Sequence, residues 1–122
     1  MRQVLIATDG SPAAEEAVQF GLELAAEQDA AAVFVHVATG ANGDGSLERA
    51  LTLAAERGIH AGTELLAGNP VDEIVAYADS ADADVIVIGS RGRGRIAGEL
   101  LGSVSRGVLQ EARRPVLVVP GA

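Results

Sequence analysis

The sequence predicts an α/β protein built on a five-stranded parallel β-sheet. Short apolar runs alternate with segments of helical periodicity along the 122 residues, which gives five strands and four helices. Val85–Ile88 is a continuous β-branched run, typical of a strand buried on both faces of a parallel sheet. Aromatic residues make up only 2% of the chain, so aliphatic side chains must form the core. Parallel neighbours require right-handed crossover connections, which the intervening helices supply.

The first strand, helix and second strand are marked by apolar runs and a capping sequence. Residues 4–7 are apolar and stop at a Thr-Asp-Gly turn, and residues 32–37 form the second apolar run. Ser11 is the predicted N-cap of the first helix, with Pro12 at its first position. Its predicted buried face consists of small and aliphatic residues at helical spacing, namely Ala14, Ala17, Val18, Gly21, Leu22 and Ala25.

The middle of the chain predicts two helices separated by a strand at residues 63–66. Ser46 is the predicted N-cap of the second helix, and Gly58 ends it. The residues expected to face inward on this helix are Leu47, Ala50, Leu51 and Ala54. Asn69 and Pro70 open the third helix. Its predicted buried face carries Val71, Ile74, Val75 and Ala78.

The last part of the chain predicts strands at residues 85–88 and 116–119 with a helix at 103–111 between them. Gly107 lies inside this helix, where glycine costs up to about 1 kcal/mol relative to alanine. We interpret it as a mark of close packing. In open sheets of this kind, ligands bind beyond the carboxyl ends of the strands, where the strand order reverses. The loops after the first and fourth strands are therefore the expected binding region.

Charge and composition narrow the classes of function. Seventeen acidic residues oppose nine basic ones, and the resulting net charge of −8 disfavours nucleic-acid binding. All nine basic residues are arginine, a composition that suits a salt-loving organism and that a GC-rich genome also produces. The chain has no cysteine, no apolar run of the roughly 18 residues that cross a bilayer, and no signal-peptide pattern at its start. We expect one domain over residues 1–122, in the cytoplasm, with neither a nucleic-acid nor a membrane partner.

The glycine-rich stretch after the fourth predicted strand is the candidate binding motif. Gly89 and Gly92 are expected to adopt positive φ and to expose backbone N–H groups as a cradle for an anion. Gly102 and Ser103 open the next helix, whose first N–H groups and dipole offer a second anion site. Ser103 and Ser105 add hydroxyl donors. The stretch lacks the Gly-Lys-Ser/Thr of a Walker A loop, so it predicts a phosphate site of another kind.

The spacing of these glycines resembles the ATP-binding branch of the universal stress protein family. That branch is marked by Gly, two residues, Gly, nine residues and then Gly-Ser or Gly-Thr, which Gly89, Gly92, Gly102 and Ser103 match. Similar segments extend along nearly the whole chain. The resemblance implies a three-layer α/β/α fold of the adenine nucleotide alpha hydrolase type, with strand order 3-2-1-4-5. It also implies a nucleotide-dependent stress or signalling module that binds ATP, with Mg or Mn bridging the phosphates.

The resemblance also implies roles for individual residues. The adenosine would lie beside Asp9 and the backbone of Ala7 and Thr8. Val37 would offer its main chain to the adenine, Ile88 would pack nearby, and Gly89 would lie near the ribose. The residues that would hold or flank the phosphates are Arg91, Gly92, Gly102, Ser103, Val104 and Ser105.

Several alternatives stay open beside this interpretation. The glycine-rich stretch, with Arg91, is also compatible with a solvated surface loop, and Asp9 with a turn or capping role. No catalytic residue and no protein metal site is predicted, and His36 and His60 are interpreted as structural. Any ATP hydrolysis should be slow, because no strong base is marked. The rival functions are a slow ATPase or nucleotide-processing enzyme, and an interaction module that uses the same fold without a nucleotide.

The last predicted strand indicates an assembly. In the strand order that the resemblance implies, residues 116–119 form an apolar edge, and an uncovered edge strand tends to pair with another chain. A second copy could pair the same strand antiparallel across a two-fold axis. We therefore expect a homodimer centred on residues 116–119.

Overall fold

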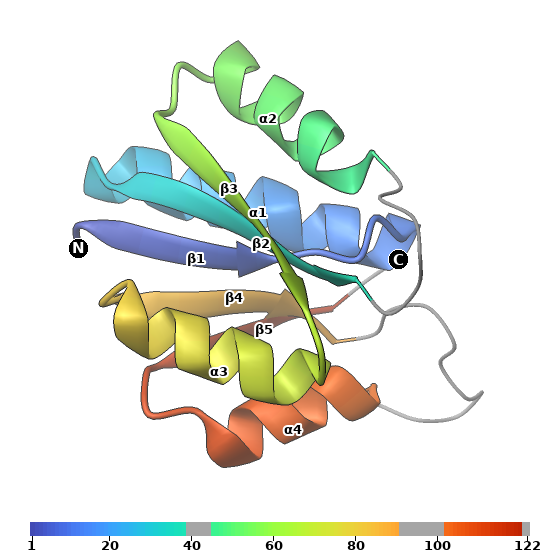
Figure 1. Ribbon diagram of the computed structural model, residues 1–122. Coiled ribbons are helices and arrows are strands. Elements are labelled where there is room, and N and C mark those ends of the chain that lie inside the picture. Colours follow the sequence, from blue (N-terminus) through green and yellow to red (C-terminus); the bar gives the residue numbers. More distant parts are fainter. Residues whose placement is uncertain (39–44, 91–101, 121–122) are drawn as a thin grey trace.

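A five-stranded sheet forms the middle layer of the structure, a computed structural model that describes residues 1–38, 45–90 and 102–120 (Figure 1). The strands are β1 (Gln3–Ala7), β2 (Ala31–Ala38), β3 (Ala61–Ala67), β4 (Val85–Gly89) and β5 (Val116–Val119). They lie in the order β3-β2-β1-β4-β5, and every neighbouring pair is parallel. The predicted sheet and its strand order are thus confirmed. The strand order reverses between β1 and β4, so a ligand is expected beyond the carboxyl ends of these two strands.

Four helices cover the two faces of the sheet. They are α1 (Pro12–Gln28), α2 (Ser46–Glu56), α3 (Pro70–Ser80) and α4 (Ser103–Glu111). Helices α1 and α2 pack on one face and α3 and α4 on the other, which gives the three-layer architecture that was predicted (Figure 1). No helix in the described ranges is long and apolar enough to cross a membrane.

Helix α1 follows the sequence prediction closely. The Ser11 hydroxyl oxygen accepts the N–H of Ala14 at 3.1 Å and caps the helix, with Pro12 at its first position. The six residues predicted to face the core are the buried ones. A Cβ on Gly21 would lie only 2.5 Å from Ile6 Cδ1, so glycine allows α1 to approach β1 closely.

Helix α2 differs from the prediction at two points. Gly45, with φ of 77°, occupies the N-cap position, so Ser46 is the first helical residue and not the cap. The left-handed backbone that precedes the helix favours glycine there. Leu53 is buried and Leu51 is 38% exposed, although Leu51 was predicted to face inward. The packing of α2 against its neighbours selects Leu53 instead.

Helices α3 and α4 pack against each other beside the sheet. Asn69 caps α3, because its side-chain oxygen accepts the N–H of Asp72 at 3.1 Å. A Cβ on Gly107 of α4 would lie 2.6 Å from Cγ2 of Val71 on α3. The interpretation of Gly107 as a close-packing residue is confirmed.

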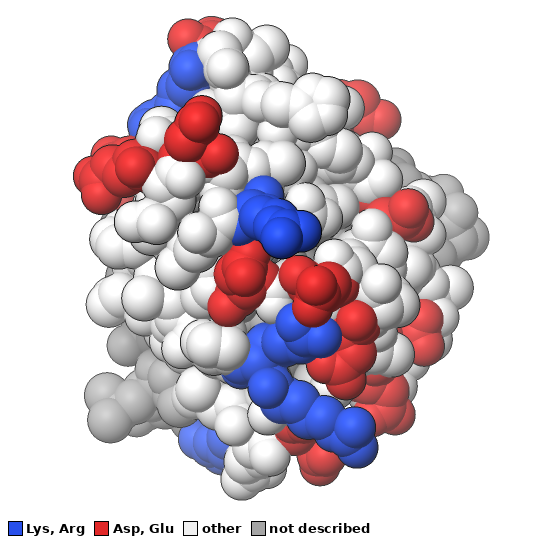
Figure 2. Space-filling view, turned by 90° about the vertical axis from the view of Figure 1, so that its left-hand side faces the viewer, with Lys and Arg blue, Asp and Glu red and all other residues white. Residues whose placement is uncertain are grey.

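Opposite charges lie next to one another at the amino ends of the strands, the edge that Figure 2 faces. Asp84 accepts the N–H groups of Gln3 at 2.9 Å and Arg2 at 2.7 Å, and these bonds lower the pKa of its carboxyl. Arg114 donates to Asp82 at 2.7 Å and Asp79 at 3.1 Å, which raises the pKa of its guanidinium. The two ion pairs of Arg114 tie the end of α3 to the start of β5. They lie at the amino ends of the strands, opposite the carboxyl ends where a ligand is expected.

Candidate functional site

The turn after β1 is held by the side chains of its own residues. Thr8 Oγ1 accepts the N–H of Gly10 at 3.2 Å, and Asp9 Oδ1 accepts the N–H of Ser11 at 2.8 Å. Gly10 has φ of 79°, in the left-handed region that glycine adopts without strain. Thr8 is buried and Asp9 is half-buried. The turn role that the sequence left open for Asp9 is therefore present in the structure.

The end of β4 and the start of α4 are joined through Ser90. The N–H of Ser90 continues the sheet by donating to Val119 O at 2.8 Å. Its carbonyl oxygen accepts the N–H of Gly102 at 2.6 Å and lies 2.9 Å from the hydroxyl of Ser105. The same hydroxyl lies 3.1 Å from Gly102 O, so its single hydrogen serves protein carbonyls. Ser105, which is buried, thus fastens α4 to β4.

Three of the four helices begin with a group that satisfies or complements their N-terminal N–H groups. Ser11 caps α1 and Asn69 caps α3 through their side chains. Helix α2 has Gly45 as N-cap and no side-chain cap, but it carries Glu48 in its first turn. A carboxylate at that position complements the positive end of the helix dipole.

Helix α4 begins with neither kind of group. Its N-cap, Gly102, has no side chain, and no acidic residue stands in its first turn. The first intrahelical bond runs from Arg106 N to Gly102 O at 3.0 Å, so the N–H groups of residues 103–105 precede the helical ladder. Ser103 and its hydroxyl are exposed on this turn. Among the described residues these N–H groups have no main-chain acceptor, and together with the positive dipole end they make an arrangement suited to an anion.

The other predicted site residues lie at the carboxyl ends of the central strands. Ala7 ends β1, Ile88 is the penultimate residue of β4, and both are buried. Gly89 is the last residue of β4 and pairs with β5. The prediction of positive φ at Gly89 is wrong, because the ladder with β5 holds it as extended strand. Arg91 and Gly92 lie outside the described residues.

Val37 lies near the end of β2, past the point where β1 stops. The last main-chain bond between described residues of these two strands runs from Thr8 N to Val35 O at 2.9 Å. Backbone polar groups alternate in direction along a strand, so the N–H and C=O of Val37 face the same side as those of Val35. Within the described residues Val37 N does not donate to Thr8 O, and His36 Nδ1 lies 2.9 Å from that oxygen instead. From the sequence we interpreted His36 as structural only, although it is the residue next to Val37, a predicted site residue.

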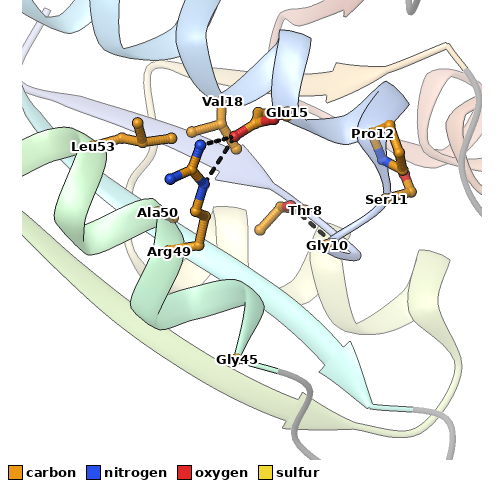
Figure 3. Close-up of a pocket in the computed structure, with 10 residues that line it drawn as sticks. All are labelled: Thr8, Gly10, Ser11, Pro12, Glu15, Val18, Gly45, Arg49, Ala50 and Leu53. Carbon is orange, nitrogen blue, oxygen red and sulfur yellow. Dashed lines mark hydrogen bonds and ion pairs between the residues drawn. The ribbon is translucent and has the colours of Figure 1, made fainter.

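A pocket of about 280 Å³ adjoins the β1 turn on the side of α1 and α2 (Figure 3). Its lining residues are Thr8, Gly10, Ser11, Pro12, Glu15, Val18, Gly45, Arg49, Ala50 and Leu53. Arg49 and Glu15 form an ion pair across it at 2.8 Å, and both side chains are substantially exposed. Among the described residues Thr8 is the one predicted site residue in this lining, so the pocket adjoins the turn after β1 and does not include the start of α4.

Comparisons of the sequence with family models and with known proteins point to the same family. The sequence model of the universal stress protein family matches residues 1–47 and 41–120. A universal stress protein of Methanocaldococcus jannaschii is 33% identical over 138 aligned residues, which cover 97% of this chain and 81% of the relative.

Solved structures agree with the sequence comparison. A universal stress protein crystallised in complex with cAMP is 33% identical with a TM-score of 0.83, over 97% of this chain and 95% of that one. The universal stress protein from Archaeoglobus fulgidus in complex with dAMP is 29% identical with a TM-score of 0.75, over 97% of this chain and 96% of its own. The family model, the relative and the folds all extend over nearly the whole sequence. The chain therefore belongs to the universal stress protein family.

Proposed function

We propose that this protein binds an adenine nucleotide, with ATP preferred, and acts in the cytoplasm as a nucleotide-dependent stress or signalling module. The start of α4 carries the proposal. It has a glycine N-cap, no acidic residue in its first turn and an exposed serine. The phosphates would accept the N–H groups of Ser103, Val104 and Ser105 and the hydroxyl of Ser103. Ser105 would hold the helix in place through its bonds to carbonyls, in place of the donor role expected from the sequence.

The adenosine would lie along the edge between β1 and β2. The N–H and C=O of Val37 face one side beyond the end of β1, and adenine carries an amino donor beside a ring acceptor. Ala7, Thr8 and Asp9 lie at the turn next to this edge, and Ile88 would pack nearby. Mg or Mn would be held mainly by the phosphate oxygens and water, as is usual for magnesium with nucleotides.

The relatives support this assignment. Two universal stress proteins of this fold, at 33% and 29% identity, were crystallised with cAMP and with dAMP. Both ligands combine an adenine base with a phosphate group. The glycine spacing that marks the ATP-binding branch favours ATP for this chain.

Calorimetry of ATP with Mg on two glycine-to-valine variants tests the proposal. Gly102 is extended, with φ of −73° and ψ of 167°, so valine fits the backbone and the new side chain is the main change. We expect Gly102→Val to weaken ATP binding at least about tenfold, a loss of about 1.4 kcal/mol. Gly62→Val is the matched control, because a Cβ at Gly62 meets nothing within 4 Å. Equal ATP affinity in both variants and the wild type would contradict the assignment.

We also propose that the protein is a homodimer through β5. This strand is the outermost of the sheet on its side, and three of its four residues are only partly buried. Ser90 N donates to Val119 O, so the alternation along the strand directs the N–H of Val118 to the open edge. A second β5 could pair with these groups antiparallel.

A further inference from the structure

We propose that His36 is a positioning residue that keeps the main chain of Val37 open toward the candidate nucleotide site. This inference rests on the proposed function, because the open edge of Val37 is where the adenine would bind. It starts from one contact, the 2.9 Å distance between His36 Nδ1 and the carbonyl oxygen of Thr8. Both residues are buried, at 9% and 6% exposure, so water does not readily replace the contact.

The contact fixes the tautomer of the imidazole. A carbonyl oxygen only accepts hydrogen bonds, so Nδ1 of His36 must carry the hydrogen and donate it. The proton of the neutral ring therefore lies on Nδ1, and Nε2 is left as an acceptor. This assignment follows from the chemistry of the partner, Thr8 O.

The same contact changes how the β1–β2 ladder ends. After Thr8 N donates to Val35 O, the next rung of a parallel ladder would be Val37 N to Thr8 O. Within the described residues that rung is not made, and the His36 ring bonds to the oxygen that would accept it, using one of its two lone pairs. The side chain of His36 thus replaces the closing rung of the ladder. As a result the N–H of Val37 points past the end of β1 and does not bond to Thr8 O.

His36 also connects the turn after β1 to the end of β2, the two segments beside the proposed adenine position. Its donor holds the Thr8 carbonyl, which precedes the Asp9–Gly10 turn, and its own backbone adjoins Val37 on β2. A change in this bond should therefore alter the turn and the adenine edge together. Glu64 and Leu65, opposite this part of β2 on β3, are exposed and make no such link.

Three substitutions of His36 separate positioning from packing. In His36→Asn the side-chain amide nitrogen takes the place of Nδ1 and can still donate to Thr8 O. In His36→Gln the amide is one bond farther along, and in His36→Phe the ring is kept without a donor. Without nucleotide, nitrogen NMR first determines the protonation of the His36 ring in the wild type, and amide hydrogen exchange at Val37 is measured in the wild type and in each variant. ATP affinity is then measured by calorimetry.

We expect the wild-type ring to be protonated on Nδ1. Exchange at Val37 should slow about tenfold or more in His36→Phe and His36→Gln, because its N–H then closes onto Thr8 O. ATP binding should weaken about three- to tenfold in these two variants and stay near wild type in His36→Asn. Because His36→Gln retains a polar side chain, it preserves the test if His36→Phe does not fold.

The outcomes distinguish the role proposed for His36 from the proposed binding of an adenine nucleotide. A ring protonated on Nε2, or unchanged exchange at Val37 in both His36→Phe and His36→Gln, would overturn the role of His36. Altered exchange with unchanged ATP affinity would overturn it as well, since the positioning would then not serve the nucleotide. If the wild type binds no adenine nucleotide while the exchange pattern holds, the proposed function fails and the assigned contact is retained.

Discussion

Replacing Gly107 with alanine tests the packing of α4 on α3, which sets the position of the candidate phosphate site. Alanine in a helix interior gains about 1 kcal/mol over glycine from its intrinsic propensity. The new Cβ would lie 2.6 Å from Val71 Cγ2 and 3.2 Å from its Cγ1, and overpacking of this kind costs about 2 kcal/mol. We expect a net loss of about 1 kcal/mol, which lowers the Tm of a chain of 122 residues by about 3–5 °C.

A second background makes the test specific. Val71→Ala removes both methyl groups that the new Cβ would meet, so Gly107→Ala should stabilise that variant by about 1 kcal/mol. The sign of the substitution thus reverses between backgrounds, a coupling of about 2 kcal/mol in a double-mutant cycle. Urea denaturation of the four proteins measures it. Stabilisation of the wild-type background by Gly107→Ala would refute the close-packing argument.

Three further predictions concern pH, assembly and catalysis. The pKa of Asp84 is lowered in the folded state, so its ionised form adds stability above pH about 4 that is lost as the pH falls through the folded value. Asp84→Asn should therefore show a flatter decline of Tm in acid, and an unchanged acid profile would contradict this. Light scattering should find a dimer for the wild type and a monomer for Val118→Pro, whereas a wild-type monomer would refute pairing through β5. Steady-state phosphate release should stay far below the ~1–100 s⁻¹ of kinases, and turnover in that range abolished by Asp9→Asn would place the protein among enzymes.

Much of the fold could be predicted because its local signals agree with its tertiary packing. Helix α1 has a serine cap, a proline at its first position and one narrow apolar face, so a single orientation buries it. The bounds of α4 and β5 were predicted as the structure has them, since Gly102 and Pro115 delimit them. In each case the turn chemistry and the apolar periodicity indicate the same boundaries.

Helix α2 shows where sequence reasoning stops. At about 100° per residue, Leu51 and Leu53 lie on opposite sides of the Ala50–Ala54 stripe, each about 80° from its middle. The two orientations bury a similar apolar area, so periodicity does not choose between them. The contact with the rest of the core buries Leu53 and leaves Leu51 exposed.

The sequence indicated which residues belong to the candidate site, but not the hydrogen bonds that connect them. Glycine spacing indicated the start of α4, and the family resemblance indicated Thr8, Asp9 and Val37. The bonds of Ser105 and His36 to main-chain carbonyls depend on the relative placement of elements distant in the sequence. The same placement makes Gly89 a strand residue where the motif suggested a turn.

An NMR titration of the isotope-labelled protein with ATP and Mg tests most directly whether the start of α4 binds the phosphates. We expect the largest shifts at the amides of Ser103, Val104 and Ser105, with a second group at Thr8, Asp9 and Val37. Titration with inorganic phosphate should shift the first group alone. Saturable ATP shifts confined to other parts of the chain, or no shifts at millimolar ATP, would contradict the assignment of the start of α4 as the phosphate site.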